Sequence, residues 1–93
     1  MDNKKLNLIR GKIDKIDHIL LDVIKKRTNL VKEVIKIKKL KKQIVDKSRI
    51  KKVLQNIKKI SKIKKIDTQI TRKIWIAMIN SYIEYEKRNF KNK

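Results

Sequence analysis

The sequence predicts an all-α protein, and three observations point to that fold class. The chain has one glycine and no proline among its 93 residues, so it has few residues suited to hairpin turns or phosphate-binding loops. Apolar residues recur at steps of three and four, the period of one face of a helix. Charged residues make up 41% of the chain and hydrophobic residues 40%, which suits helices with one solvated face. We expect three helices, one of them very long, in a single domain spanning residues 1–93.

The first predicted helix runs from about residue 4 to about residue 42, and at 1.5 Å per residue it would be roughly 60 Å long. The rest of the chain is too short to cover both flanks of such a rod while also closing a core, so we expect a second copy of the chain to cover it. The apolar positions form a heptad seam, which consists of Leu6, Ile9, Ile13, Ile16, Leu20, Val23, Leu30, Val34 and Ile37.

Two shorter helices are predicted after the seam stops near residues 41–44. Asp46 or Ser48 can cap the second helix, which should fray across residues 61–66, and Asp67 or Thr68 can cap the third, which should end at about Arg88. The apolar face of the second helix consists of Ile50, Val53, Leu54, Ile57 and Ile60. That of the third consists of Ile70, Ile74, Trp75, Met78, Ile79, Tyr82 and Ile83.

The composition excludes several classes of function. No cysteine and a single histidine, His18, argue against thiolate zinc sites, histidine metal clusters and Ser-His-Asp triads, so we expect no metal and no cofactor. The longest stretch without charge, residues 74–83, is about half of what a membrane-spanning helix needs. No apolar segment of signal-peptide type follows the N-terminus, so we expect a cytoplasmic protein.

The formal net charge of +20, from 29 Lys and Arg against nine Asp and Glu, raises the question of a nucleic-acid or membrane partner. Lysine dominates and is spread over the whole chain together with many Ile and Asn, as an AT-rich coding sequence would produce. A solvated Lys-rich surface therefore explains the charge, and four aromatic residues, mostly on one stripe, offer no stacking platform. The basic runs 36–42 and 58–65 keep open a binding protein for nucleic acid or another anionic surface, but we expect no specific nucleic-acid partner.

One cation breaks the seam of the first helix. Arg27 stands where an apolar residue is expected, and no acid lies three or four residues away, so a buried guanidinium there would need an anion. Alternatively, its stem packs while its head reaches water, or it sets the register of a coiled coil. Lys38 lies three turns and about 20° further on, hence on the same face, whereas Arg10 is about 100° away and would better serve the groove of a partner chain.

An acid breaks the apolar stripe of the third helix. Trp75, Ile79 and Tyr82 follow one another by four and three, and the next step of four lands on Glu86. A functional acid at this position competes with a simpler interpretation, a frayed and solvated helix end at which Glu86 pairs with Lys87 or Arg88.

Together these features resemble the all-α chorismate mutase family, which includes the related isochorismate-pyruvate lyase. Residues 9–17, Ile-Arg-Gly-Lys-Ile-Asp-Lys-Ile-Asp, look like the signature of the family's first helix, an Arg followed by apolar-Asp-x-apolar-Asp. Arg27 and Lys38 follow at the family's spacings. Residues 46–49 are similar to the start of the second helix and residues 78–84 to the third, so the resemblance covers nearly the whole chain.

The resemblance implies an intertwined helical homodimer with two active sites and chorismate, a small dicarboxylate, as substrate. Rearrangement of chorismate to prephenate, a step in aromatic amino-acid biosynthesis, breaks one C–O bond as a C–C bond forms and needs no covalent intermediate. Arg27 and the partner's Arg10 would each hold a carboxylate, and Lys38 would hydrogen-bond the ether oxygen. The implied catalytic residues are Lys38 and Glu86, and the implied substrate-binding residues are Arg10, Arg27, Asp46, Arg49, Ile50 and Tyr82.

Two positions depart from the pattern of many mutases. Glu86 stands where many have a glutamine that donates to the ether oxygen, and a carboxyl group donates only when protonated, so we expect activity to fall as pH rises through the titration of Glu86. Ile50 replaces a glutamate that accepts the ring hydroxyl of chorismate, and the lyase is similar in carrying an apolar residue there. We therefore expect a chorismate mutase, with an isochorismate-pyruvate lyase as the first alternative and a non-catalytic basic helical binding protein as the second.

Overall fold

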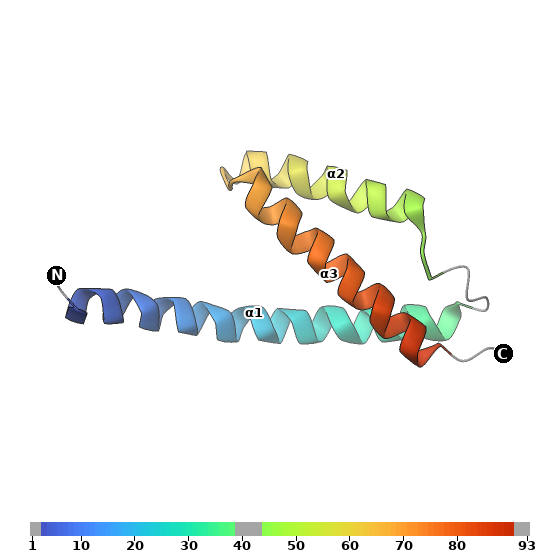
Figure 1. Cartoon of the computed structure of the whole chain (residues 1–93), viewed down its shortest axis with the longest axis horizontal. Coiled ribbons are helices and arrows are strands. Elements are labelled where there is room, and N and C mark those ends of the chain that lie inside the picture. Colours follow the sequence, from blue (N-terminus) through green and yellow to red (C-terminus); the bar gives the residue numbers. More distant parts are fainter. Residues whose placement is uncertain (1–2, 39–43, 91–93) are drawn as a thin grey trace. The chain divides into compact units, whose positions relative to one another are not determined.

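The computed structural model describes residues 3–38 and 44–90, and over these ranges the chain forms helices and no strands, which confirms the predicted fold class. The helices are α1 (Asn3–Ile37), α2 (Lys47–Ile63) and α3 (Thr68–Asn89) (Figure 1). The chain divides into two compact units, Met1–Val34 and Ile35–Lys93. In the described part of the chain, no helix is both long enough and apolar enough to cross a membrane.

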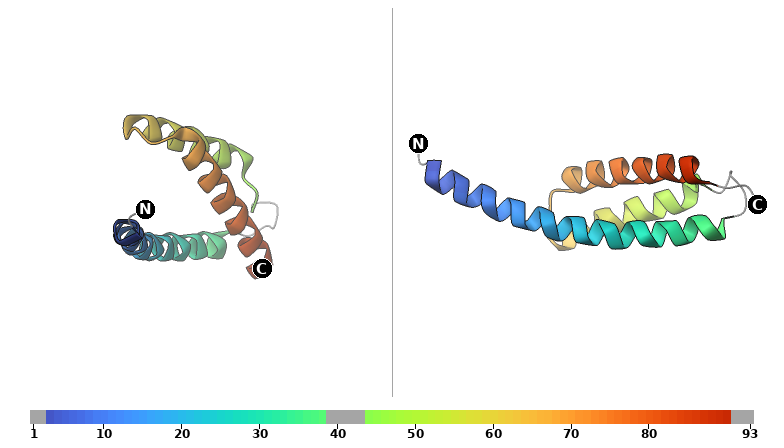
Figure 2. Two further views of the ribbon diagram at one scale, coloured as in Figure 1. Left: turned by 60° about the vertical axis from the view of Figure 1, so that its left-hand side comes forward. Right: turned by 90° about the horizontal axis from the view of Figure 1, so that it is seen from below.

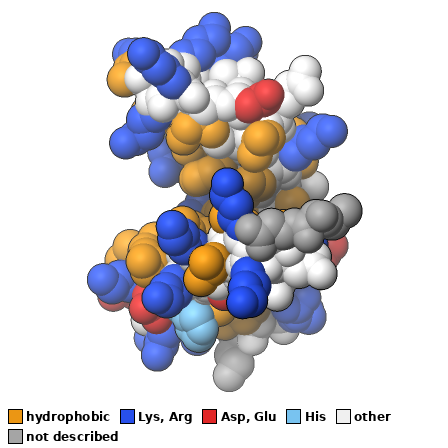
Figure 3. Space-filling model, turned by 90° about the vertical axis from the view of Figure 1, so that its left-hand side faces the viewer, with side chains coloured by type: hydrophobic (Ala, Val, Ile, Leu, Met, Phe, Trp, Pro, Cys, Tyr) orange, Lys and Arg blue, Asp and Glu red, His pale blue; other side chains and the backbone are white. Residues whose placement is uncertain are grey.

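Helix α1 is a continuous rod of 35 residues, about 52 Å long at 1.5 Å per residue (Figure 2). None of its residues is buried. The seam is exposed, with Ile16 at 56%, Leu20 at 52% and Leu30 at 61%. Figure 3 shows apolar side chains lying open between Lys and Arg side chains on one face of the molecule. Over residues 3–34, the described part of the first unit, no apolar residue is thus buried.

The predicted end of the first helix is wrong. We expected the helix to continue to about residue 42, but α1 ends at Ile37 and Lys38 lies outside it. The Lys38 ammonium instead contacts Glu86 of α3 and the backbone carbonyl of Ile44, and these contacts with later residues compete with a further helical turn. The rest of the predicted ending, residues 39–43, lies outside the described residues.

Helices α2 and α3 form an antiparallel pair joined by a short turn (Figures 1 and 2). Each begins at an aspartate whose side chain accepts hydrogen bonds from backbone N–H groups of the first turn, as the sequence predicts. Asp46 accepts from the N–H of Arg49 at 3.0 Å. Asp67 accepts from the N–H groups of Gln69 and Ile70 at 2.8 and 3.3 Å. Both caps fix where the helices start.

The sequence predicts fraying across residues 61–66, which is wrong for residues 61–63: α2 continues to Ile63, because Ser61 is buried at the contact with α3. Its hydroxyl bonds the carbonyl of Ile57 at 2.6 Å and shares a 2.8 Å hydrogen bond with the hydroxyl of Thr71, which is also buried. The helix ends two residues later at Ile63. Lys65 then takes a left-handed conformation with φ of 59°. The N–H groups of Ile66 and Lys65 donate to the carbonyls of Ser61 and Lys62, a helix-ending pattern in which the left-handed residue is usually glycine.

Candidate active site

The candidate site is centred on a partly buried ion pair between Lys38 and Glu86. The Glu86 residue is 7% exposed, and its carboxylate accepts a hydrogen bond from the Lys38 ammonium at 2.9 Å. The same ammonium lies 3.5 Å from the carbonyl oxygen of Ile44, a residue that is only 4% exposed. The end of α1, the segment before α2 and the last turns of α3 therefore meet at one cation, all within the Ile35–Lys93 unit.

This pairing identifies what the acid in the apolar stripe does. Trp75, Ile79 and Tyr82 are half-buried, and Glu86 continues their stripe into a buried position. A buried carboxylate is costly without a cation, and Lys38 supplies one. The alternative of a solvated helix end, with Glu86 paired to Lys87 or Arg88, is therefore wrong.

The ammonium of Lys38 keeps capacity for a ligand. It has three N–H donors, of which Glu86 and the Ile44 carbonyl take two. Its side chain is 18% exposed, so the group is sheltered but reachable. The geometry thus offers a fixed, partly desolvated donor for an oxygen on which negative charge develops.

Lys38 reaches this position by a route different from the predicted one. From the sequence we expect Lys38 inside the first helix and on the same face as Arg27, because the two residues are about three turns apart. Because Lys38 lies beyond the last residue of α1, helical rotation does not set its direction. The direction of the Lys38 side chain is determined instead by its contacts with Glu86 and Ile44.

Arg10 and Arg27 both lie on α1, exposed and half-buried respectively. They are separated by about 25 Å along the helix axis, at 1.5 Å per residue. A small dicarboxylate is far shorter than that, so the two guanidinium groups of one chain cannot hold the same molecule. This separation agrees with the expectation that Arg10 serves the site of a partner chain.

The remaining predicted residues lie on α2 and α3. Asp46 and Arg49 are exposed at the start of α2, where the Asp46 carboxylate caps the helix by accepting from the Arg49 backbone N–H. Ile50 follows, half-buried. Tyr82 is half-buried on α3, one turn before Glu86. The structure thus brings Lys38 and Glu86 into contact and joins Asp46 to Arg49 through the cap.

Ile44 contributes to the site although no sequence pattern predicts it. The residue is buried, and its carbonyl oxygen helps to hold the Lys38 ammonium. The available signal was the apolar pair of Ile44 and Val45, isolated in a polar segment directly before the Asp46 cap. Such a pair has no helical periodicity, so the pattern of apolar residues does not predict its role.

Comparison with known proteins finds one family whose model matches the chain. The family model described as chorismate mutase type II matches residues 9–87, a span that includes every predicted site residue from Arg10 to Glu86. No curated protein and no solved structure matches the chain. The family match extends over most of the chain and reaches all three helices, so the chain belongs to the chorismate mutase type II family.

Proposed function

We propose that the protein is a chorismate mutase that rearranges chorismate to prephenate in the biosynthesis of aromatic amino acids. The observation that carries the proposal is the Lys38 ammonium, held 2.9 Å from the buried Glu86 carboxylate with a donor to spare. The family membership supplies the substrate class.

The rearrangement needs orientation and electrostatics rather than a nucleophile. The C–O bond of the enolpyruvyl ether breaks as a C–C bond to the ring forms, and no proton or covalent enzyme intermediate is required. Negative charge builds on the ether oxygen in the transition state, where Lys38 would donate a hydrogen bond. One preorganised donor of this kind is worth on the order of 10²–10³ in rate.

The substrate's two carboxylates need cations of their own. Arg27 would hold one carboxylate and Arg10 of a partner chain the other, which folds the flexible arm over the ring. Arg49, Asp46, Ile50 and Tyr82 complete the proposed binding residues. Two observations support the exchange of Arg10 between chains: the separation of about 25 Å between Arg10 and Arg27 on one helix, and the exposed apolar seam of α1.

That seam supports an intertwined homodimer in which residues 1–93 of each copy act as one domain. Leu20, Val23 and Leu30 are each more than half exposed, at 52%, 54% and 61%. Burying such side chains yields roughly 1.5–3 kcal/mol each, which favours association through α1. Sedimentation equilibrium should give twice the chain mass of 11.2 kDa; a monomer at all concentrations would contradict the dimer.

The protonation state of Glu86 would affect how well the site stabilises negative charge on the ether oxygen. In its ionised form the carboxylate repels developing negative charge, and only its protonated form donates a hydrogen bond there. Because Glu86 directly contacts Lys38, both groups would lie within reach of the same substrate atom. We therefore propose that the reaction is faster when Glu86 carries a proton.

Ile50 favours a second candidate function, the cleavage of isochorismate to salicylate and pyruvate. The residue is apolar and half-buried, so it cannot accept a hydrogen bond from the ring hydroxyl of chorismate. Isochorismate carries its hydroxyl elsewhere on the ring, and the missing acceptor matters less for it.

The test is to give the purified protein chorismate and isochorismate separately and to follow prephenate, salicylate and pyruvate. Prephenate formation that is lost in Arg27→Ala would support the mutase. Salicylate and pyruvate formed only from isochorismate would support the lyase. If neither substrate is turned over at any pH from acid to neutral, both activities are refuted and a non-catalytic basic binding protein becomes the better account.

We also propose that the protein acts in the cytoplasm and has no specific nucleic-acid partner. The lysines are distributed over all three helices rather than gathered into one recognition element. DNA binding that disappears steeply with added salt and shows no sequence preference would agree, whereas a sequence-specific complex at physiological salt would contradict it.

A further inference from the structure

A pocket of about 460 Å³ lies between α2 and α3, within the Ile35–Lys93 unit. This volume falls in the range of small-molecule sites. The pocket is lined by four cations, two apolar residues and an amide, and no acid lines it: Lys47, Ile50, Lys51, Leu54, Gln55, Lys58 and Arg72.

The cations reach the pocket from two helices. Lys47, Lys51 and Lys58 follow one another on α2 at steps of four and seven, which places them on one face. Arg72 comes from α3. Ile50 and Leu54, both half-buried, supply an apolar surface beside them.

The charge in this pocket lacks a counter-charge. Lys47, Lys51, Lys58 and Arg72 form no ion pair among the residues that the structure describes, in contrast to Lys38. Like charges that converge on one cavity repel each other, and an anion in the cavity relieves that repulsion. A second cavity of about 240 Å³ shares Leu54, Lys58 and Arg72 and extends the same basic surface toward the start of α3.

Arg49, the cation that α2 would contribute to the proposed active site, does not line the pocket and lies on another face of α2. Arg49 and Lys51 are two residues apart, so their side chains point about 160° away from each other around the helix. Neither Lys38 nor Glu86 lines the pocket, and of the proposed substrate-binding residues only Ile50 does.

We propose that this pocket binds a small molecule with an apolar ring and two anionic groups, such as carboxylates, phosphates or sulfonates. Lys47 and Lys51 would hold one anionic group and Lys58 and Arg72 the other, because about 10 Å of α2 separates Lys51 from Lys58. The ring would lie on Ile50 and Leu54. The proposal goes beyond the proposed function, because it requires no turnover of chorismate.

The probe is naphthalene-1,5-disulfonate, titrated calorimetrically into the full-length protein. We expect one disulfonate per chain and much weaker binding of sulfate and of uncharged naphthalenemethanol, since each lacks one of the two features. Lys58→Gln/Arg72→Gln should weaken disulfonate binding at least about tenfold, because two of the four cations are removed.

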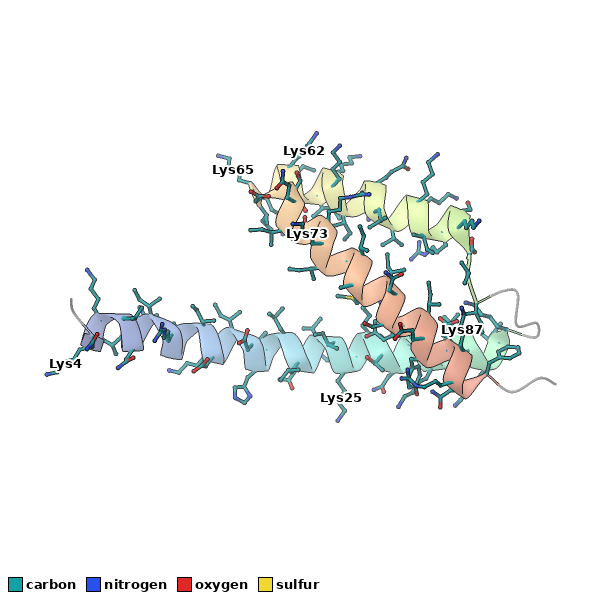
Figure 4. All side chains as sticks on the ribbon, viewed as in Figure 1. Lys4, Lys25, Lys62, Lys65, Lys73 and Lys87 are labelled. Carbon is teal, nitrogen blue, oxygen red and sulfur yellow. The ribbon has the colours of Figure 1, made fainter. Side chains whose placement is uncertain are left out.

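The matched control is Lys62→Gln/Lys73→Gln. It removes the same net charge from the same two helices (Figure 4 labels both lysines), but neither residue lines the pocket. It should weaken binding less than about twofold at the same ionic strength. Equal losses in the two double variants, several disulfonates per chain, or sulfate binding as tightly as the disulfonate would overturn the proposal, because each result would indicate general attraction to a basic surface.

A second measurement keeps the proposal testable if the pocket variant does not fold. In the unaltered protein, the amide resonances of residues 47–58 and 68–72 should shift on addition of the disulfonate. Shifts confined to α1 would overturn the proposal, since they would place the probe on the exposed apolar seam.

Discussion

Replacing Lys38 by methionine should destabilise the fold far more than replacing both members of the ion pair. In Lys38→Met the Glu86 carboxylate, 7% exposed, loses the cation that lies 2.9 Å away. Removing one partner of a buried pair costs about 3–5 kcal/mol; the Lys38 side chain is 18% exposed, so we expect the lower end, about 3 kcal/mol. In Lys38→Met/Glu86→Leu no charge is left behind, and the free energy of unfolding should lie within about 1 kcal/mol of the unaltered protein.

The assay is urea unfolding followed by far-UV circular dichroism near neutral pH, at one fixed chain concentration because association changes the apparent stability. Glu86→Leu completes a double-mutant cycle, from which we expect a coupling free energy of about 2–3 kcal/mol. The matched control is Lys36→Met, which removes an exposed lysine of α1 and should change stability by less than about 0.5 kcal/mol. If Lys38→Met behaves like Lys36→Met, or if the two single changes simply add, the ion pair does not hold the fold as inferred.

Three further changes test other parts of the account. A mixture of Arg10→Ala and Arg27→Ala chains should recover about a quarter of the unaltered activity, because half of randomly formed dimers have one intact site; a mixture as inactive as its components would refute the exchange of Arg10. Glu86→Gln should form prephenate faster than the unaltered protein at neutral pH, because an amide donates a hydrogen bond where an ionised carboxylate cannot, and an equal or lower rate would contradict the proposed role of the Glu86 proton. Lys65→Gly should raise the free energy of unfolding by about 1 kcal/mol, because Lys65 sits at a φ of 59° that favours glycine, and a destabilised variant in the same urea assay would contradict this.

The helices could be predicted from the sequence because their causes are local. Apolar residues at steps of three and four predict the three segments. At each start two capping residues are possible, Asp46 or Ser48 and Asp67 or Thr68, and in the structure the aspartates cap α2 and α3. The two errors have a common cause. The chain leaves the helix after Ile37, where Lys38 bonds residues of later segments, and α2 continues past Ser61, whose hydroxyl meets that of Thr71. Contacts between segments determine where α1 and α2 end, and the spacing of apolar residues does not predict such contacts.

The candidate site could be predicted only in part. Glu86 stands out in the sequence because it interrupts an apolar stripe. Lys38 stands out because a continuous helix would place it on the face of Arg27, but α1 ends at Ile37, before Lys38. Their direct pairing joins segments 48 residues apart, which no local pattern predicts. The basic pocket was missed for a different reason: in a chain with 29 Lys and Arg, any single cation, including Arg72, resembles a solvated surface residue.

The central claim is that Lys38 acts on chorismate, and the most direct measurement is the initial rate of prephenate formation by the unaltered protein, Lys38→Met and Lys36→Met, at a temperature where circular dichroism shows all three folded. The account predicts that the unaltered protein and Lys36→Met form prephenate at similar rates, and that Lys38→Met is slower by on the order of 10²–10³. Prephenate formation by Lys38→Met at the rate of Lys36→Met would contradict it.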